Sequence, residues 1–131
     1  MNTFLKPYLA ALLVMGVLVA LWLGLLARDF YRQEIGAQML EQVRWVPAAL
    51  FYFVYPAALV ALALFPTGQP LSHQIARAAL VGLVAYGVYD ASNLATLKSW
   101  TVKLALVDTV WGVFASTLAG AAAAWVGQRY S

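Results

Sequence analysis

The sequence contains no cysteine, which excludes disulfides, thiolate nucleophiles, iron–sulfur clusters and cysteine-ligated zinc. It contains a single histidine, His73, so one chain cannot supply two axial histidines to haem or a multi-histidine metal site. His73 follows Pro70 in a predicted loop, where we expect it at the membrane interface, and Ser72 could cap the helix that begins after it. We predict no metal site, and the sequence identifies no cofactor.

Charge is scarce as well. Charged residues make up 10% of the 131 residues and hydrophobic residues 64%, whereas about a quarter of a soluble domain is charged. The mean hydropathy is +0.80. The eight Lys and Arg residues are scattered rather than clustered, so we predict no nucleic-acid partner. These features predict one integral membrane domain over residues 1–131.

Four apolar stretches have the length of about 20 residues that a helix needs to cross a bilayer. We predict an all-α membrane bundle with spans at about 8–27, 46–65, 75–97 and 104–126. A signal peptide is the competing interpretation of the first stretch, but its apolar run exceeds the roughly 7–15 residues of a signal-peptide core.

The segment 28–44 separates the first two spans and holds six charges of balanced sign. Tyr31, Ile35 and Met39 recur at four-residue spacing, with Leu40 and Val43 beside them, which is the pattern of an amphipathic helix. We expect this helix to lie in the membrane interface on its apolar face. A short solvated helix packed on the bundle is the alternative.

Four spans place the first and third loops on one side of the membrane. Basic residues are more frequent on that side than on the other: Arg28, Arg32, Arg44, Lys98 and Lys103 against Lys6, Arg77 and Arg129. The positive-inside rule then predicts both termini outside. A bias of five to three also leaves the opposite or a dual orientation open.

Small residues recur every four positions in three of the predicted spans, a pattern that lets helix backbones approach closely in a bilayer. The rows are Asp108, Gly112, Ser116, Gly120 and Ala124; Ala78, Gly82, Tyr86 and Asp90; and Gly16, Ala20 and Gly24, ending at Arg28. We therefore expect a packing face on each of these helices, with Asp108 directed toward protein.

Asp90 and Asp108 are the two acids within the spans, where an ionised carboxylate costs a few kcal/mol unless it is paired or faces a cavity. Counted from Lys98 and Lys103, they lie at roughly 12 and 8 Å below the same interface. Tyr86 and Asn93 share a helix face with Asp90. Arg28 is the best cationic partner for these acids, and Lys98 is the second.

Two interpretations of this group stay open. In the functional one, six residues line a small polar cavity that opens to one side: Tyr86, Asp90, Asn93, Lys98, Asp108 and Arg28. In the structural one, the acids only tie the third and fourth spans to Arg28 or to backbone donors. Acids within a membrane favour the functional interpretation.

A motif runs through the last two spans: Tyr86-Gly-Val-Tyr89-Asp90-Ala-Ser-Asn93-Leu-Ala-Thr96-Leu-Lys98-Ser-Trp100, then Asp108-Thr-Val-Trp111-Gly112. With Trp22-Leu23-Gly24, Phe30-Tyr31 and Phe51-Tyr52, it resembles a bacterial family of uncharacterised, predicted four-span membrane proteins over nearly the whole chain. The resemblance implies a multi-pass protein of the bacterial inner membrane, often encoded beside genes for membrane-lipid modification.

That family usually carries another aspartate three residues before the tryptophan of the first span, where this chain has Val19. The departure implies that any acid site operates here with Asp90 and Asp108 alone. It also distinguishes the chain from a familiar small multidrug exporter, which has an acid in its first helix.

The sequence leaves three functions open. The first is binding or transport of a small molecule or membrane lipid in an acid-containing cavity between the third and fourth spans, in a protein that could form a homodimer. The second is a membrane-embedded enzyme of lipid modification with Asp90 and Asp108 as an acid/base pair, although no nucleophile motif or phosphate loop supports it. The third is an accessory subunit of a membrane complex.

Overall fold

The computed structural model describes residues 2–36 and 44–130, and within these ranges the chain is helical with connecting turns, as predicted. The elements are α1 (Asn2–Leu21), a π-helical segment η1 (Trp22–Leu26), α2 (Arg28–Ile35), α3 (Trp45–Leu64), α4 (Leu71–Thr96) and α5 (Val102–Tyr130). Four stretches are long and apolar enough to cross a membrane: Thr3–Leu25, Trp45–Leu64, Leu71–Thr96 and Val102–Tyr130. The prediction of an all-α bundle with four such helices is confirmed.

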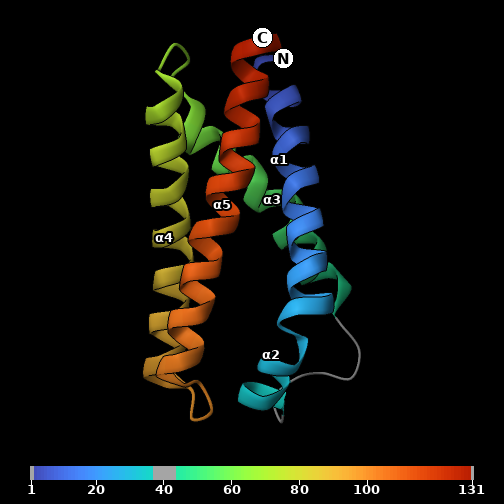
Figure 1. Cartoon of the computed structure of the whole chain (residues 1–131), viewed down its shortest axis with the longest axis vertical. Helices are drawn as coiled ribbons and strands as arrows, with labels where there is room; N and C mark the ends of the chain where they lie inside the picture. Colours follow the sequence, from blue (N-terminus) through green and yellow to red (C-terminus); the bar gives the residue numbers. More distant parts are fainter. Residues whose placement is uncertain (1, 37–43, 131) are drawn as a thin grey trace.

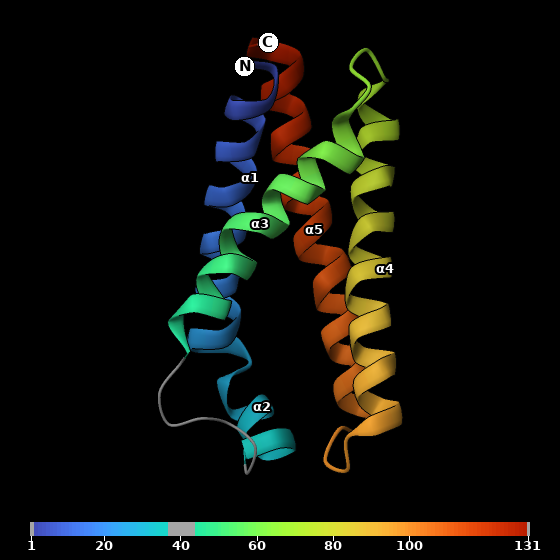
Figure 2. The same ribbon diagram turned by 180° about the vertical axis from the view of Figure 1, so that it is seen from behind.

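Both termini lie at one end of the bundle, and α2 and the α4–α5 turn lie at the other (Figure 1). α3 crosses the bundle obliquely: it lies beside α4 near the turn that joins them and diverges from α4 toward α2 (Figure 2). The first and third connections are therefore at the same end, as the even spacing of the spans predicted.

The closest helix contact joins α4 and α5, and the small residues singled out in the sequence form it. A Cβ added at Gly120 would lie 2.2 Å from the Cβ of Ala78, and one added at Gly82 would lie 2.7 Å from the Cβ of Ser116. Such distances are shorter than any non-bonded carbon–carbon contact, so glycine is required for the two backbones to approach this closely. The predicted stripes on these two helices are thus in contact.

The same antiparallel register continues toward α2. The ring of Tyr86 packs on Gly112, where an added Cβ would lie 2.0 Å from the Tyr86 Cγ. One helical turn further along, Asp90 on α4 meets Asp108 on α5, and both residues are buried. The four-residue spacing of the stripes therefore brings the two acids together.

The stripe on α1 behaves differently from the prediction. The buried face of α1 is formed by Ala11 and Met15, which are not part of the stripe. Of the stripe residues, Ala20 is exposed, and a Cβ added at Gly24 would have no neighbour within 4 Å. Gly16 alone contacts another helix closely, through a tyrosine of α3. A row of small residues here does not mark the packing face, because larger side chains on another face fill the space against α3 and α5.

Two local predictions also need correction. α4 begins at Leu71 with Pro70 at its N-cap, so Ser72 and His73 lie within its first turn and not in a capping position and a loop. His73 is exposed, as expected. Proline favours this start because its fixed φ suits the residue at a helix boundary.

The segment 28–44 contains a helix, but its apolar face packs on protein. α2 covers Arg28–Ile35, and Tyr31 in its centre is buried against the bundle. This agrees with the alternative of a short helix packed on the bundle. The other predicted apolar positions, Met39, Leu40 and Val43, lie outside the described residues.

Candidate functional site

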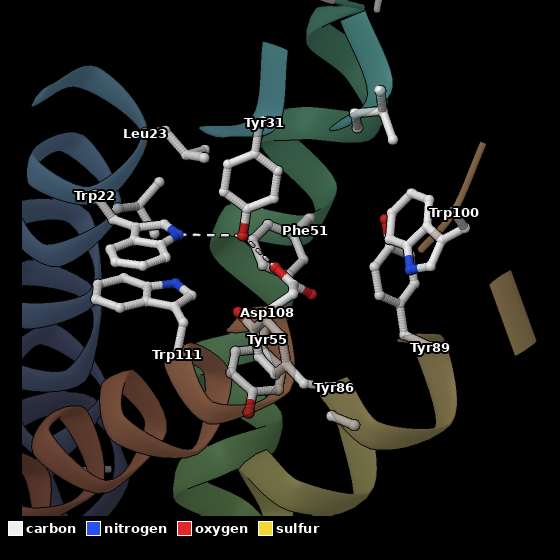
Figure 3. Close-up of a pocket in the computed structure, with 13 residues that line it drawn as sticks. Trp22, Leu23, Tyr31, Phe51, Tyr55, Tyr86, Tyr89, Trp100, Asp108 and Trp111 are labelled. Carbon is white, nitrogen blue, oxygen red and sulfur yellow. Dashed lines mark hydrogen bonds between the residues drawn. The ribbon is translucent and has the colours of Figure 1, made fainter. Parts of the chain in front are cut away.

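A pocket of about 550 Å³ lies in the half of the bundle nearest α2. Every helical element contributes to its wall (Figure 3). The lining residues are Val19, Trp22, Leu23, Tyr31, Ile35, Phe51, Tyr55, Ala85, Tyr86, Tyr89, Trp100, Asp108 and Trp111. α4 and α5 are in close contact, so the cavity predicted between these two spans lies beside them instead, between their aromatic face and the other helices.

Eight of these residues are aromatic, and their rings lie on opposite sides of the pocket. On one side Trp22 and Trp111 stack with centroids 4.4 Å apart and planes 4° from parallel. On the other side Tyr89 and Trp100 meet edge to face, with centroids 5.7 Å apart. Paired rings hold each other's orientation by about 0.5–1.5 kcal/mol, so the walls are preformed.

A chain of hydrogen bonds crosses the pocket from η1 through α2 to α5. The Trp22 indole N–H donates to the Tyr31 hydroxyl over 3.2 Å, and that hydroxyl donates to Asp108 Oδ1 over 2.6 Å. Burial, and secondly the hydrogen bond to Asp108, raise the pKa of Tyr31, so the phenol stays neutral and keeps its proton to donate. A carboxylate acceptor makes this a strong bond.

The π-helical turn of η1 sets the start of this chain. The Ala27 N–H donates to the Trp22 carbonyl oxygen over 2.7 Å, five residues back instead of four. The extra residue widens the turn before α2 begins at Arg28. Trp22 and Tyr31 can then approach each other at the end of the first span.

The two aspartates form a buried pair. Thr109 donates its hydroxyl proton to Asp90 Oδ2 over 3.1 Å, and Asp108 Oδ1 accepts from Tyr31. The remaining oxygens, Asp90 Oδ1 and Asp108 Oδ2, are buried and accept no hydrogen bond of ordinary geometry from the described residues. The Trp100 indole interacts with Asp90, and the two carboxyl groups interact with each other. A proton shared between the carboxyl groups would satisfy both oxygens and leave the pair with one negative charge.

The structure thus brings together three of the six predicted site residues. Tyr86 and Asp108 line the pocket, and Asp90 lies behind Asp108, in contact with it but outside the lining. Their proximity follows from the α4–α5 register.

The other three lie apart from the pocket wall. Arg28 and Lys98 are exposed, and Asn93 is half-buried and interacts with Tyr89. The proposed pairing of Arg28 with an aspartate is absent, because the acids are held by hydroxyl groups and by each other. An exposed guanidinium keeps its hydration, whereas burying it beside the acids would cost several kcal/mol.

Sequence reasoning had not placed Trp22, Tyr31 or Trp111 in the site. All three occur in the motifs quoted above, but nothing in their spacing shows that residues 80 positions apart share one pocket. Tyr55 also lines the pocket, and its hydroxyl hydrogen-bonds Ser116 Oγ over 2.6 Å. Val19, where an aspartate was expected from the resemblance, also lines the wall.

Replacing Tyr31 with phenylalanine is expected to destabilise the fold by about 2 kcal/mol, because Asp108 Oδ1 loses its donor and the Trp22 indole loses its acceptor. Thermal unfolding in detergent, followed by circular dichroism, measures this. Tyr130→Phe is the control, since Tyr130 is exposed at the end of α5. Equal stability of the two variants would mean that the hydrogen-bond chain contributes nothing.

The fold and the site define a helical integral membrane protein with a buried acid pair beside an aromatic pocket. Residues 4–125 match the family described as "Predicted membrane protein (DUF2177)", and the chain belongs to this family. No curated protein and no solved structure matches the chain.

Proposed function

We propose that this protein binds an amphipathic small molecule or lipid in the aromatic pocket, and that the ligand enters sideways from the bilayer. We place the protein in the bacterial inner membrane as a multi-pass protein, with membrane lipid among its partners. We also propose that the protein transports this ligand. The single observation that carries it is a rim of exposed pocket residues within the membrane-spanning helices.

The rim lies between α3 and α4. Phe51 on α3 is 48% exposed, Tyr89 on α4 is 53% exposed, and Ala85, one turn before Tyr89, is also exposed. All three line the pocket, and all three lie within stretches that can span a membrane. α3 diverges from α4 toward α2 (Figure 2), and the exposed side chains of these three lining residues mark the side on which a ligand would enter from the lipid.

The size and chemistry of the pocket suit such a ligand. A volume of about 550 Å³ is in the range of small-molecule sites, roughly 300–1,000 Å³. The walls are apolar or aromatic except for Asp108 and the tyrosine hydroxyls. A hydrocarbon segment would pack on the rings, while a polar group would lie at Asp108, which supports an amphiphile over a fully polar solute.

The tryptophans allow a direct test. The chain has five, and three of them, Trp22, Trp100 and Trp111, line the pocket. Trp45 and Trp125 are exposed, so a variant with Trp45→Phe and Trp125→Phe keeps only the pocket indoles. We expect alkyl amphiphiles with brominated chains to quench this variant's fluorescence saturably, with displacement by the unbrominated amphiphile. Quenching that rises linearly without saturation or displacement would refute the proposal.

A further inference from the structure

We infer that the polar group accepted by the pocket is a quaternary ammonium carrying an alkyl chain. The inference rests on the proposed function and specifies its ligand class. It is drawn from the lining, in which aromatic side chains surround one carboxyl group and basic side chains are missing.

Asp108 is the charged group of the pocket. Asp108 is 9% exposed and lines the cavity, and its Oδ2 atom is buried without a hydrogen-bond donor among the described residues. The Oδ1 atom is already held by Tyr31, which fixes the direction of the carboxyl group (Figure 3). A ligand cation would therefore meet an oriented carboxyl group in surroundings from which water is largely displaced.

The acid pair can supply the negative charge that a cation needs. Two neighbouring carboxyl groups repel each other when both are ionised, and a cation bound beside them offsets this repulsion. The titratable groups that face Asp108 are Asp90 and the phenols of Tyr31, Tyr86 and Tyr89. Each of these groups is an acid, so none places a positive charge near the ligand.

The aromatic walls favour a quaternary ammonium over a primary amine. Ring faces attract cations most where water is excluded, and a cluster of such faces is the usual site for trimethylammonium groups. Trp22, Trp111, Tyr86 and Trp100 come from three sides of the pocket. A primary ammonium would need three hydrogen-bond acceptors, but Asp108 Oδ1 already accepts from Tyr31 and Asp108 Oδ2 is buried, so tyrosine hydroxyls are the acceptors that remain in the lining.

The positions of the basic residues at this end of the molecule argue against an anionic ligand in the pocket. Arg28, Arg32, Lys98 and Lys103 are exposed and none of them lines the pocket. An anionic head group inside would face Asp108 with no compensating charge, at a cost of several kcal/mol. A phosphate could lie only outside, near those basic side chains.

The test compares four amphiphiles that share a dodecyl chain: dodecyltrimethylammonium, dodecylphosphocholine, dodecyl maltoside and dodecyl sulfate. Each competes for the saturable quenching of the three-tryptophan variant. We expect dodecyltrimethylammonium to bind at least about tenfold more tightly than the maltoside, with the sulfate weakest. Dodecylphosphocholine shows whether the natural ammonium ligand is a lipid head group or a free cation. An affinity near that of dodecyltrimethylammonium indicates a choline lipid, and an affinity near that of the maltoside indicates a free lipophilic cation.

Asp108→Asn keeps an oxygen to accept from Tyr31, and we expect it to abolish the preference for the ammonium over the maltoside. Asp29→Asn removes an exposed acid from α2 and should leave the preference intact. Saturable binding of all four amphiphiles with equal affinity would overturn the ammonium assignment and leave the pocket proposal standing. Absence of saturable binding by any of them would overturn both.

Discussion

Replacing Gly112 with alanine is expected to destabilise the protein by about 3 kcal/mol, the upper end of the range for overpacked cores. The new Cβ would lie 2.0 Å from Tyr86 Cγ and 2.3 and 2.4 Å from its two Cδ atoms. These atoms form the root of the ring, which cannot move aside as a flexible chain tip could. Either Tyr86 leaves the pocket wall or α4 separates from α5.

Gly87→Ala is the matched control on the facing helix. A Cβ there would lie 4.0 Å from Thr109 Cγ2, an ordinary contact, so the change should be neutral or stabilising by up to about 1 kcal/mol through helix propensity. Thermal unfolding in detergent compares the two variants. If Gly112→Ala were as stable as Gly87→Ala, the α4–α5 contact that positions the acid pair would be wrong.

Replacing Ala85 with tryptophan is expected to eliminate ligand binding without unfolding the bundle. Ala85 is an exposed rim residue on α4 that also lines the pocket, so a large ring there fills the entrance but displaces no core residue. We expect at least a tenfold loss of affinity in competition binding with an unmodified amphiphile, because one indole takes up a large part of a pocket of about 550 Å³.

Val84→Trp controls for this change. Val84 is the preceding residue, is 56% exposed, and does not line the pocket. The Val84→Trp variant should bind the ligand as the parent protein does and should have the same thermal stability. Equal binding by both variants would show that the ligand does not enter between α3 and α4.

Much of the fold could be predicted because the bilayer limits the alternatives. Charge scarcity and four apolar stretches of sufficient length indicate an all-helical bundle, since only helices or closed barrels satisfy their backbone groups in lipid. The small-residue rows on α4 and α5 also predicted the face of contact. The prediction from the row on α1 was wrong, because small residues allow a close approach of two helices but do not require one. Met15 and Ala11 are buried instead.

The candidate site was predictable only in part. Asp90, Asp108 and Tyr86 could be predicted because a charged residue at membrane depth needs a partner and because their spacing places them on facing helices. Tyr31 could not, since its place against Asp108 depends on a π-helical turn at Trp22 that local spacing does not encode. The predicted pairing of Arg28 with an aspartate was wrong, because the sequence does not show which side of α2 faces outward.

The most direct test of the account is photo-crosslinking in membranes with a dodecyltrimethylammonium whose chain carries a diazirine, followed by peptide mapping. We expect labelling of the peptides that contain Trp22 and Tyr86, and loss of that labelling when excess unmodified dodecyltrimethylammonium is added. Labelling confined to lipid-facing residues such as Leu13 and Val110, and unaffected by the competitor, would contradict a ligand pocket in this protein.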